Sequence, residues 1–428
     1  MIVEAPSVGR RRLRRWTKIL SAFFSANTLI QITGLASGLL FVRAFPVDEF
    51  ALYTLAMSVV TFFTFVTDLG STVSLIYFFR EVAGSEEEFA GFATAVQSLR
   101  RIVFFAGAVL VAVVFPALAI GRGFPTTRVL LCTAGVVATV GFQIRAALGL
   151  LALRLRDRYA LAYRSEIVGS CLRLALAVVI VATGLISAPV ALASGVIATW
   201  ATAQLADRGP KAFVPPAELA LKRRRVLRYL LPTLPAAFYF ATQGPLLVWL
   251  SATFGDRRNI AEIGALTRLG LVVGILSSLA GAVFLPHLAR IADDRLYRIR
   301  FFQFGAALAI WPIALLGAAA LAPRAFLFVL GPHYQGLESE LLWLVGAAGF
   351  SLLDGYFVSV NLARSWTRFQ VPMLVVQIAV QALMIMQWHL STTEHVMMFN
   401  LVSAAFACTL QLINLGIGFS RPAWVHWR

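Results

Sequence analysis

The sequence predicts an all-α polytopic membrane protein with about twelve transmembrane helices in two sets of six. Three observations carry this prediction: a composition suited to lipid, a series of long apolar runs, and cations that alternate between the segments joining those runs. Of the 428 residues, 59% are hydrophobic and 13% are charged, whereas soluble domains carry about 25% charged residues. The chain is therefore expected to lie in a bilayer.

A helix that crosses a bilayer needs about 20 mainly apolar residues. Twelve segments meet this requirement: 19–42, 50–79, 102–120, 129–153, 166–186, 188–206, 226–254, 262–286, 299–322, 338–361, 369–390 and 396–419. The first follows a basic head, as a signal peptide would, but no clear small-residue cleavage site follows it, so it is interpreted as a retained span. Cys132, Cys171 and Cys408 all fall inside apolar runs, without the paired spacing of a disulfide framework or a metal site.

The cationic residues predict the orientation of these spans. If the amino terminus lies in the cytoplasm, inside segments hold 28 lysines and arginines and outside segments hold 6. Cytoplasmic loops of membrane proteins carry such an excess of cations. We therefore expect both termini to lie in the cytoplasm, and we interpret the net charge of +17 as a topology signal and as contact with anionic membrane lipids. Nucleic acid is not an expected partner.

The longest inside loop divides the chain in two. Residues 1–206 form the predicted first lobe, 207–225 a cytoplasmic linker, and 226–428 the second lobe. The halves share a faint repeat, since Glu49-Phe50-Ala51 with Thr54 matches Glu262-Ile263-Gly264 with Thr267 at an offset of 213 residues. The match occurs at the same span boundary in each half, which is the pattern of parallel repeats in transporters.

Spans one and seven are the interrupted ones. Span one contains Asn27, Gln31, Gly34 and Gly38, and span seven contains Pro232, Pro235, Gln243, Gly244 and Pro245. Proline removes a backbone donor, so span seven should bend. Corresponding breaks in two halves point to a substrate path. The spacing of Gly34 and Gly38 is equally typical of plain helix packing, and the sequence leaves both interpretations open.

Three stretches carry a family resemblance. Residues 36–81 contain a small-residue helix that ends in Arg43, then "FPVDEFALYTL", then a long helix with Asp68-Leu69-Gly70 and Arg80. The other two stretches are residues 261–290 and 322–353. The chain resembles the Wzx-like bacterial polysaccharide flippases of the multidrug/oligosaccharidyl-lipid/polysaccharide exporter (MOP) superfamily. Ala51 stands where that family usually has glycine, a change expected to tighten the turn without altering function.

The resemblance implies a specific architecture and function. It implies two six-helix lobes around a central cavity that opens alternately to the cytoplasm and to the outside. It also implies a lipid-linked glycan as substrate, moved from the cytoplasmic to the outer leaflet of the bacterial inner membrane for assembly of O-antigen or exopolysaccharide. Polysaccharide polymerase and export machinery are then expected partners. A drug/cation antiporter of the MATE type is the alternative on the same fold.

Two carboxylates lie well inside predicted spans, Asp68 and Asp354. If span two is one helix, Asp68 lies about 18 Å from Arg80 along it, and must be protonated, paired with a cation or exposed to a wet cavity. A buried pair, most plausibly with Arg145, competes with coupling to H⁺ or Na⁺. The same reasoning applies to Asp354.

Three arginines also lie within spans: Arg145, Arg173 and Arg268. Each could snorkel to the membrane surface along its own stem, most readily Arg268 and least readily Arg145. A passage lined by them favours an anion, because guanidinium binds phosphate bidentately. They are the predicted sites for an anionic headgroup, with Asn27, Gln31, Gln143 and Gln243 as further polar cavity residues and Gln31 and Gln243 facing sugar hydroxyls.

The sequence does not favour an enzyme. The longest outside segment, 322–337, offers Arg324, His333 and Tyr334 as its titratable groups. The sequence has no Walker lysine loop and no His-Glu-x-x-His motif, so neither an ATPase nor a zinc site is expected. No cofactor and no metal are predicted, apart from the candidate coupling ion. An antiporter for cationic drugs would need carboxylates to dominate its cavity, and here arginines outnumber them.

Overall fold

The computed structural model describes residues 26–68, 70–82, 85–206, 215–231, 234–270, 294–364, 366 and 368–420. The described residues form helices and no strands. The first lobe has residues 26–44, which form a helix, then α2 (Val47–Asp68), α3 (Ser71–Glu81), α4 (Glu86–Gly121), α5 (Thr126–Leu155), α6 (Tyr159–Thr183) and α7 (Ala188–Ala206). After α8 (Pro216–Leu230), the second lobe has α9 (Leu234–Phe254), residues 257–270, which are helical, then α11 (Asp294–Leu321), α12 (Pro323–Leu330), the 3-10 turn η2 (Pro332–Tyr334), α13 (Glu338–Ala363), α14 (Gln370–Gln387) and α15 (Thr393–Ser420).

Nine helices within the described residues are long and apolar enough to cross a membrane. They are α2, α4, α5, α6, α7, α11, α13, α14 and α15, and each overlaps one of the twelve predicted spans. The predicted span 226–254 contains α9, which is not one of these nine and whose sequence includes Thr242, Gln243 and Pro245. The spans predicted at 19–42 and 262–286 are described from residue 26 and up to residue 270. The all-α polytopic prediction is confirmed.

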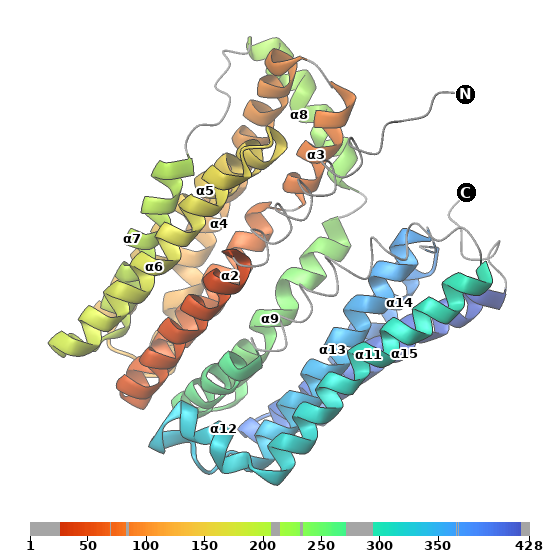
Figure 1. Cartoon of the computed structure of the whole chain (residues 1–428). Coiled ribbons are helices and arrows are strands. Elements are labelled where there is room, and N and C mark those ends of the chain that lie inside the picture. Colours follow the sequence, from red (N-terminus) through yellow and green to blue (C-terminus); the bar gives the residue numbers. More distant parts are fainter. Residues whose placement is uncertain are drawn as a thin grey trace, which may run out of the picture.

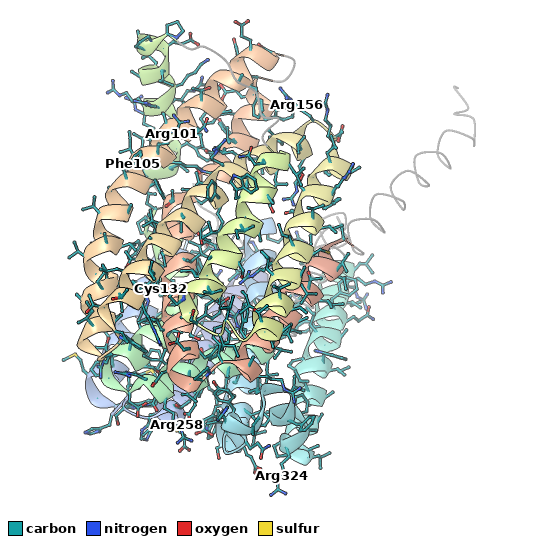
Figure 2. All side chains as sticks on the ribbon, turned by 90° about the vertical axis from the view of Figure 1, so that its left-hand side faces the viewer. Arg101, Phe105, Cys132, Arg156, Arg258 and Arg324 are labelled. Carbon is teal, nitrogen blue, oxygen red and sulfur yellow. The ribbon has the colours of Figure 1, made fainter. Side chains whose placement is uncertain are left out.

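The two lobes approach each other at one end and diverge at the other (Figure 1). The close end lies beside α12, and the wide end carries α8 (Figure 1). These are called the α12 end and the α8 end below. Figure 2 shows Arg101 and Arg156 toward the α8 end, Arg258 and Arg324 at the α12 end, and Phe105 and Cys132 between them. The predicted topology places the α8 end in the cytoplasm.

The outward-facing side chains of the spans are apolar. Phe105, Val109 and Val113 on α4 are each about two-thirds exposed, as are Ile310 and Ile313 on α11. A soluble protein rarely exposes such a continuous apolar surface. A bilayer satisfies these side chains, while the helical backbone keeps its own polar groups hydrogen-bonded.

The repeated glutamates perform the same task in each lobe. Glu49 accepts a hydrogen bond from the backbone N–H of Ala188, the first residue of α7, at 2.8 Å. Glu262 accepts one from the hydroxyl of Thr393, the first residue of α15, at 2.6 Å. Both carboxylates are 7% exposed, and each also pairs with an arginine. Each glutamate thus anchors the start of the last helix of its lobe, so the sequence repeat has a structural counterpart.

The second predicted span is two helices. The sequence analysis treated 50–79 as continuous, but α2 ends at Asp68 and α3 begins at Ser71. Gly70 adopts a left-handed backbone conformation, φ 74°, which glycine permits without a steric cost. Asp68 therefore lies at a helix end, a third exposed, rather than deep along an unbroken helix.

Asp68 pairs with Arg100 of α4, whereas the sequence analysis had suggested Arg145. The Arg100 side chain is 2% exposed, and its Nε donates to the hydroxyl of Ser71 at 2.6 Å. That hydroxyl in turn donates to Asp68 at 3.3 Å. α4 begins at Glu86, well before the predicted span 102–120, and this puts Arg100 level with the break between α2 and α3. The network fixes this break against α4.

Replacing Asp68 should destabilise the protein rather than selectively stop transport. Asp68→Asn leaves the Arg100 charge buried without its counter-charge, which costs about 3–5 kcal/mol for a fully buried pair and less here because Asp68 is partly exposed. Thermal unfolding in detergent should show a clear loss for Asp68→Asn and for Arg100→Met. The double variant should recover part of that loss. A stable, inactive Asp68→Asn protein would instead indicate a coupling charge.

Candidate functional site

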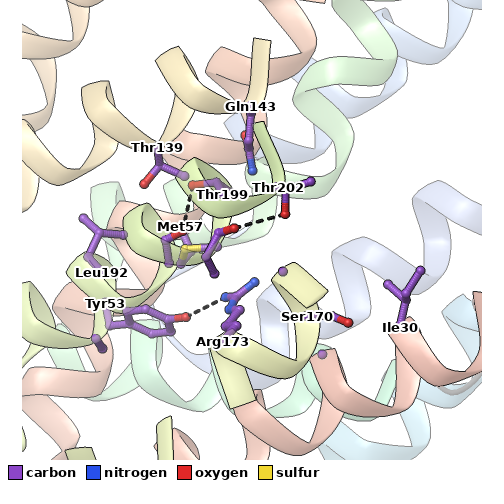
Figure 3. Close-up of a pocket in the computed structure, with 15 residues that line it drawn as sticks. Ile30, Tyr53, Met57, Thr139, Gln143, Ser170, Arg173, Leu192, Thr199 and Thr202 are labelled. Atoms are coloured by element: carbon purple, nitrogen blue, oxygen red, sulfur yellow. Dashed lines mark hydrogen bonds between the residues drawn. The ribbon is translucent and has the colours of Figure 1, made fainter. Parts of the chain in front are cut away.

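The first lobe contains a cavity of about 240 Å³ (Figure 3). It is lined by residues of helix 26–44, α2, α5, α6 and α7. Small side chains provide the space: Gly34 has no atom within 4 Å of the position that a Cβ would occupy. Gly169 lets α6 approach α7, because a Cβ there would stand 1.9 Å from the hydroxyl of Thr202. The cavity therefore has a close contact between α6 and α7 on one side and open space beside Gly34.

The cation of this cavity is Arg173. Its Nη2 donates to the hydroxyl of Tyr53 at 3.1 Å, and Figure 3 shows the two side chains meeting across the cavity. The Nε of Arg173 is buried and has no hydrogen-bond partner. Gln143 lines the same cavity and accepts a hydrogen bond from Thr64 at 2.5 Å.

Arg268 reaches the same region from the second lobe. A Cβ on Gly38 would stand 3.2 Å from its Cδ and 3.4 Å from its Nε, so the side chain lies against the bare backbone of helix 26–44. It is within electrostatic range of both Tyr53 and Arg173. Its Nε is buried without a hydrogen-bond partner. Arg268 therefore does not snorkel to the membrane surface. Because Gly38 has no side chain, the Arg268 side chain can lie against the backbone of helix 26–44.

Arg173 and Arg268 thus form an interlobe arginine pair around Tyr53. Among the described residues, no carboxylate pairs with either guanidinium. Two like charges repel strongly where water is scarce, and a nearby anion would relieve that repulsion. Guanidinium offers a rigid fork of donors that matches phosphate oxygens. The pair can therefore hold an anionic group between the lobes.

The second lobe contains a larger cavity of about 550 Å³. Its lining comes from α9, helix 257–270, α13, α14 and α15. The charged residue in this lining is Asp354, whose Oδ1 is buried without a hydrogen-bond partner among the described residues. Amides supply most of the remaining polar groups: Gln243, Gln377, Asn400 and Gln411.

Some of these amides are already engaged in the wall. Gln381 donates to Gln243 at 3.0 Å and to the hydroxyl of Ser403 at 2.5 Å. Asn361 donates to Gln411 at 2.9 Å. These bonds join α9, α13, α14 and α15 through buried polar contacts, which rigidify a core when they are satisfied.

The other predicted site residues are placed as follows. Arg145 is exposed on α5 and lines neither cavity. Asn27 and Gln31 are half-buried on helix 26–44 and also lie outside both linings. The structure thus brings Arg173, Arg268 and Gln143 to one region and Gln243 and Asp354 to another. Among the described residues, no group of three or more His, Cys, Asp and Glu side chains gathers as a metal site would require.

Sequence reasoning missed three polar residues in or beside the two cavities: Tyr53, Gln377 and Gln381. Tyr53 was part of the quoted "EFALYTL" motif, but nothing in the sequence tied its hydroxyl to Arg173. Gln377 and Gln381 lie within an apolar run of α14. Their spacing of four residues, which places both near one face of a helix, was the available signal.

The fold is shared with known membrane proteins. One similar structure is that of the lipid II flippase MurJ in an inward closed conformation, with a TM-score of 0.71, 13% sequence identity, and coverage of 92% of this chain and 87% of that chain. This chain has the fold of the MOP superfamily transporters.

Two further structures extend the comparison. One is an inward-facing multidrug resistance MATE transporter of the MOP superfamily, with a TM-score of 0.63, 14% identity, and coverage of 91% of this chain and 94% of that chain. The other is a eukaryotic MATE transporter, with a TM-score of 0.60, 12% identity, and coverage of 96% and 98%. No protein-family model and no curated protein matches the sequence.

Proposed function

We propose that this protein moves a lipid-diphosphate-linked oligosaccharide from the cytoplasmic to the outer leaflet of the bacterial inner membrane, by alternating access. The observation that carries the proposal is the interlobe arginine pair. Arg173 belongs to the first lobe and Arg268 to the second, and neither has a counter-charge among the described residues. A diphosphate bound between them would be contacted by both lobes, which is the arrangement that lobe rocking requires.

Three further observations support this function. A protein of the same fold is described as a lipid II flippase. The substrate would enter from the α8 end, where the lobes diverge (Figure 1) and which the charge distribution predicts to be cytoplasmic. Glycan delivered outside would pass to a polysaccharide polymerase and export machinery. The protein would act as a carrier and not as an enzyme.

Removing the arginine pair should block transport. In Arg173→Ala and Arg268→Ala cells, lipid-linked glycan should accumulate on the cytoplasmic face while its synthesis continues. Each change removes charge-assisted hydrogen bonds worth about 1.5–3 kcal/mol, so transport should fall about tenfold or more. Lysine at either position should restore it partly, because a point charge replaces a bidentate fork.

The matched control is Arg324→Ala, since Arg324 lies in a segment predicted to be outside and is 91% exposed. It should leave surface glycan normal. Normal surface glycan in a well-expressed Arg173→Ala/Arg268→Ala double variant would refute the proposal.

The MATE-type drug/cation antiporter remains the second candidate, because of Asp354. Its unpartnered carboxylate oxygen lies in the larger cavity and could hold a H⁺ or Na⁺ in either function. If the protein exports cationic drugs, its deletion should make cells sensitive to them and leave surface glycan unchanged.

Coupling to an ion at Asp354 has its own test. In proteoliposomes, Asp354→Asn should preserve the folded protein and abolish the response of transport to an imposed H⁺ or Na⁺ gradient, because an amide can neither release a proton nor neutralise a cation. An Asp354→Asn protein that responds to both gradients as the wild type does would exclude this role. Thermal unfolding of the same preparations controls for folding.

A further inference from the structure

The two cavities differ in charge in a way that suits the two ends of an amphipathic substrate. Among the described residues, the lining of the smaller cavity has Arg173 and no carboxylate, while that of the larger has Asp354 and no cation. A diphosphate is attracted to the first and repelled from the second. An uncharged group rich in hydroxyls is not repelled by Asp354 and can use the amides as donors and acceptors.

Two amides of the larger cavity are available for a ligand. Gln377 on α14 and Asn400 on α15 both line it, and neither side chain is hydrogen-bonded to any described residue. The Tyr239 hydroxyl lies buried on the same lining. Polar groups inside a membrane protein are costly unless they are satisfied, so these groups indicate a polar occupant.

The larger cavity also adjoins the arginine pair. Thr267 lines it, and the next residue of the same helix, Arg268, lies against Gly38. Gly38 is one helical turn from Gly34, which lines the smaller cavity. The larger cavity and the arginine pair are therefore reached by consecutive residues of one helix, Thr267 and Arg268. The volume of about 550 Å³ lies within the range of small-molecule sites.

We infer that the second-lobe cavity is the glycan subsite: it binds the uncharged sugars of the substrate through Gln377 and Asn400, while the diphosphate stays at the interlobe arginine pair. Phe240 adds an apolar ring to the lining, against which the carbon face of a sugar ring can pack. This inference rests on the proposed function and assigns each part of the substrate to a separate site.

The test compares two probes on the purified protein in nanodiscs: polyprenyl diphosphate without sugar, and lipid-linked glycan extracted from the cells that make it. Gln377→Leu/Asn400→Leu should weaken binding of the glycan probe about tenfold, because two hydrogen bonds are lost, and leave the sugar-free probe unchanged. Arg173→Ala should weaken both probes. The control Gln387→Leu changes an exposed glutamine of the same helix outside the cavity and should change neither.

The outcomes separate the subsite from the proposed function. If the wild type binds neither probe, the proposed function fails. If it binds both and the double variant binds glycan as the wild type does, the subsite assignment fails while the function stands. Equal weakening of both probes would place the diphosphate in the larger cavity and overturn the division by charge. Neither replaced amide has a hydrogen-bond partner among the described residues, so the double variant strands no polar group there.

A second, independent observation concerns the α12 end. Arg122 follows the last residue of α4, and its guanidinium donates to three carbonyls at the end of α9 in the other lobe: Ala252 at 2.5 Å, Gly255 at 2.6 Å, and Thr253. Arg257 returns the contact. It donates to the carbonyl of Arg122 at 2.8 Å and to that of Gly123.

Each arginine thus caps the carboxyl end of a helix in the opposite lobe. Helix carboxyl ends leave carbonyls unpaired and carry partial negative charge, so a guanidinium is favoured there. Gly123 leaves room for Arg257: its φ is 77°, and a Cβ there would overlap the Arg257 guanidinium. The guanidinium carbon of Arg257 also lies 4.8 Å from the ring centre of Phe124. Separating the lobes at this end would break all five hydrogen bonds together.

We propose that this reciprocal arginine clasp is the latch that keeps the α12 end closed. Spin labels at exposed positions of the two lobes, Thr127→Cys on α5 and Glu394→Cys on α15, would report the separation in a background without the native cysteines. The wild type should give one short distance, and Arg122→Ala/Arg257→Ala a longer, broader distribution. Arg324→Ala is the control and should match the wild type.

An unchanged distance distribution in a folded Arg122→Ala/Arg257→Ala protein would refute the latch. Arg122→Lys/Arg257→Lys should lie between the wild type and the alanine variant, since lysine keeps the charge and loses the fork. A lysine variant identical to the alanine one would still support the latch and attribute it to the fork geometry. A merely local role in capping would lower the melting temperature without moving the labels.

Discussion

The structure depends on one constraint, that a charge removed from water needs a counter-charge or a set of hydrogen bonds. The Asp68–Arg100 pair meets this constraint at the break between α2 and α3. Glu49 and Glu262 meet it where each lobe begins its last helix. Arg122 and Arg257 meet it with backbone carbonyls of the opposite lobe. These contacts hold the helices in place. Arg173, Arg268 and Asp354 differ from them, because they lack such partners among the described residues.

The exceptions to this pairing are the candidate functional groups. Arg173 and Arg268 have no counter-charge among the described residues, and Asp354 has a buried oxygen without a partner there. Unsatisfied polar groups are costly in any protein and more so in a bilayer. They persist where a ligand supplies the missing partner. Because the arginine pair draws on both lobes and the carboxylate on one, the anion and the coupling ion are expected at separate places.

The two ends of the molecule differ: the lobes are close together at the α12 end and apart at the α8 end (Figure 1). At the α12 end the clasp is accompanied by close packing, since a Cβ on Gly264 would stand 2.3 Å from the Thr54 hydroxyl oxygen. The guanidinium carbon of Arg43 lies 5.4 Å from the ring centre of Phe328 of α12, and the ring centres of Tyr334 and Phe50 are 6.4 Å apart. Burial and the nearby Glu262 raise the pKa of the Tyr334 hydroxyl above its ordinary value, so this contact stays uncharged. Hydrogen bonds from arginines, ring contacts and close helix packing thus hold this end together.

The sequence by itself determined the class of protein and the approximate positions of nine spans. Nine predicted spans overlap helices because about 20 apolar residues can be satisfied in lipid only as a helix. The repeat around Glu49 and Glu262 was visible because both lobes need the same anchor at the same boundary. These features follow from local composition and spacing.

Only the tertiary structure decided which charges meet. Asp68 was expected to pair with Arg145, but the left-handed Gly70 ends α2 early and Arg100 becomes its partner. Arg268 appeared free to snorkel, and Gly38, 230 residues earlier in the chain, turned out to admit it between the lobes. Helix rotation and lobe packing set such pairings. They depend on contacts between distant segments, which a single sequence does not encode in any local pattern.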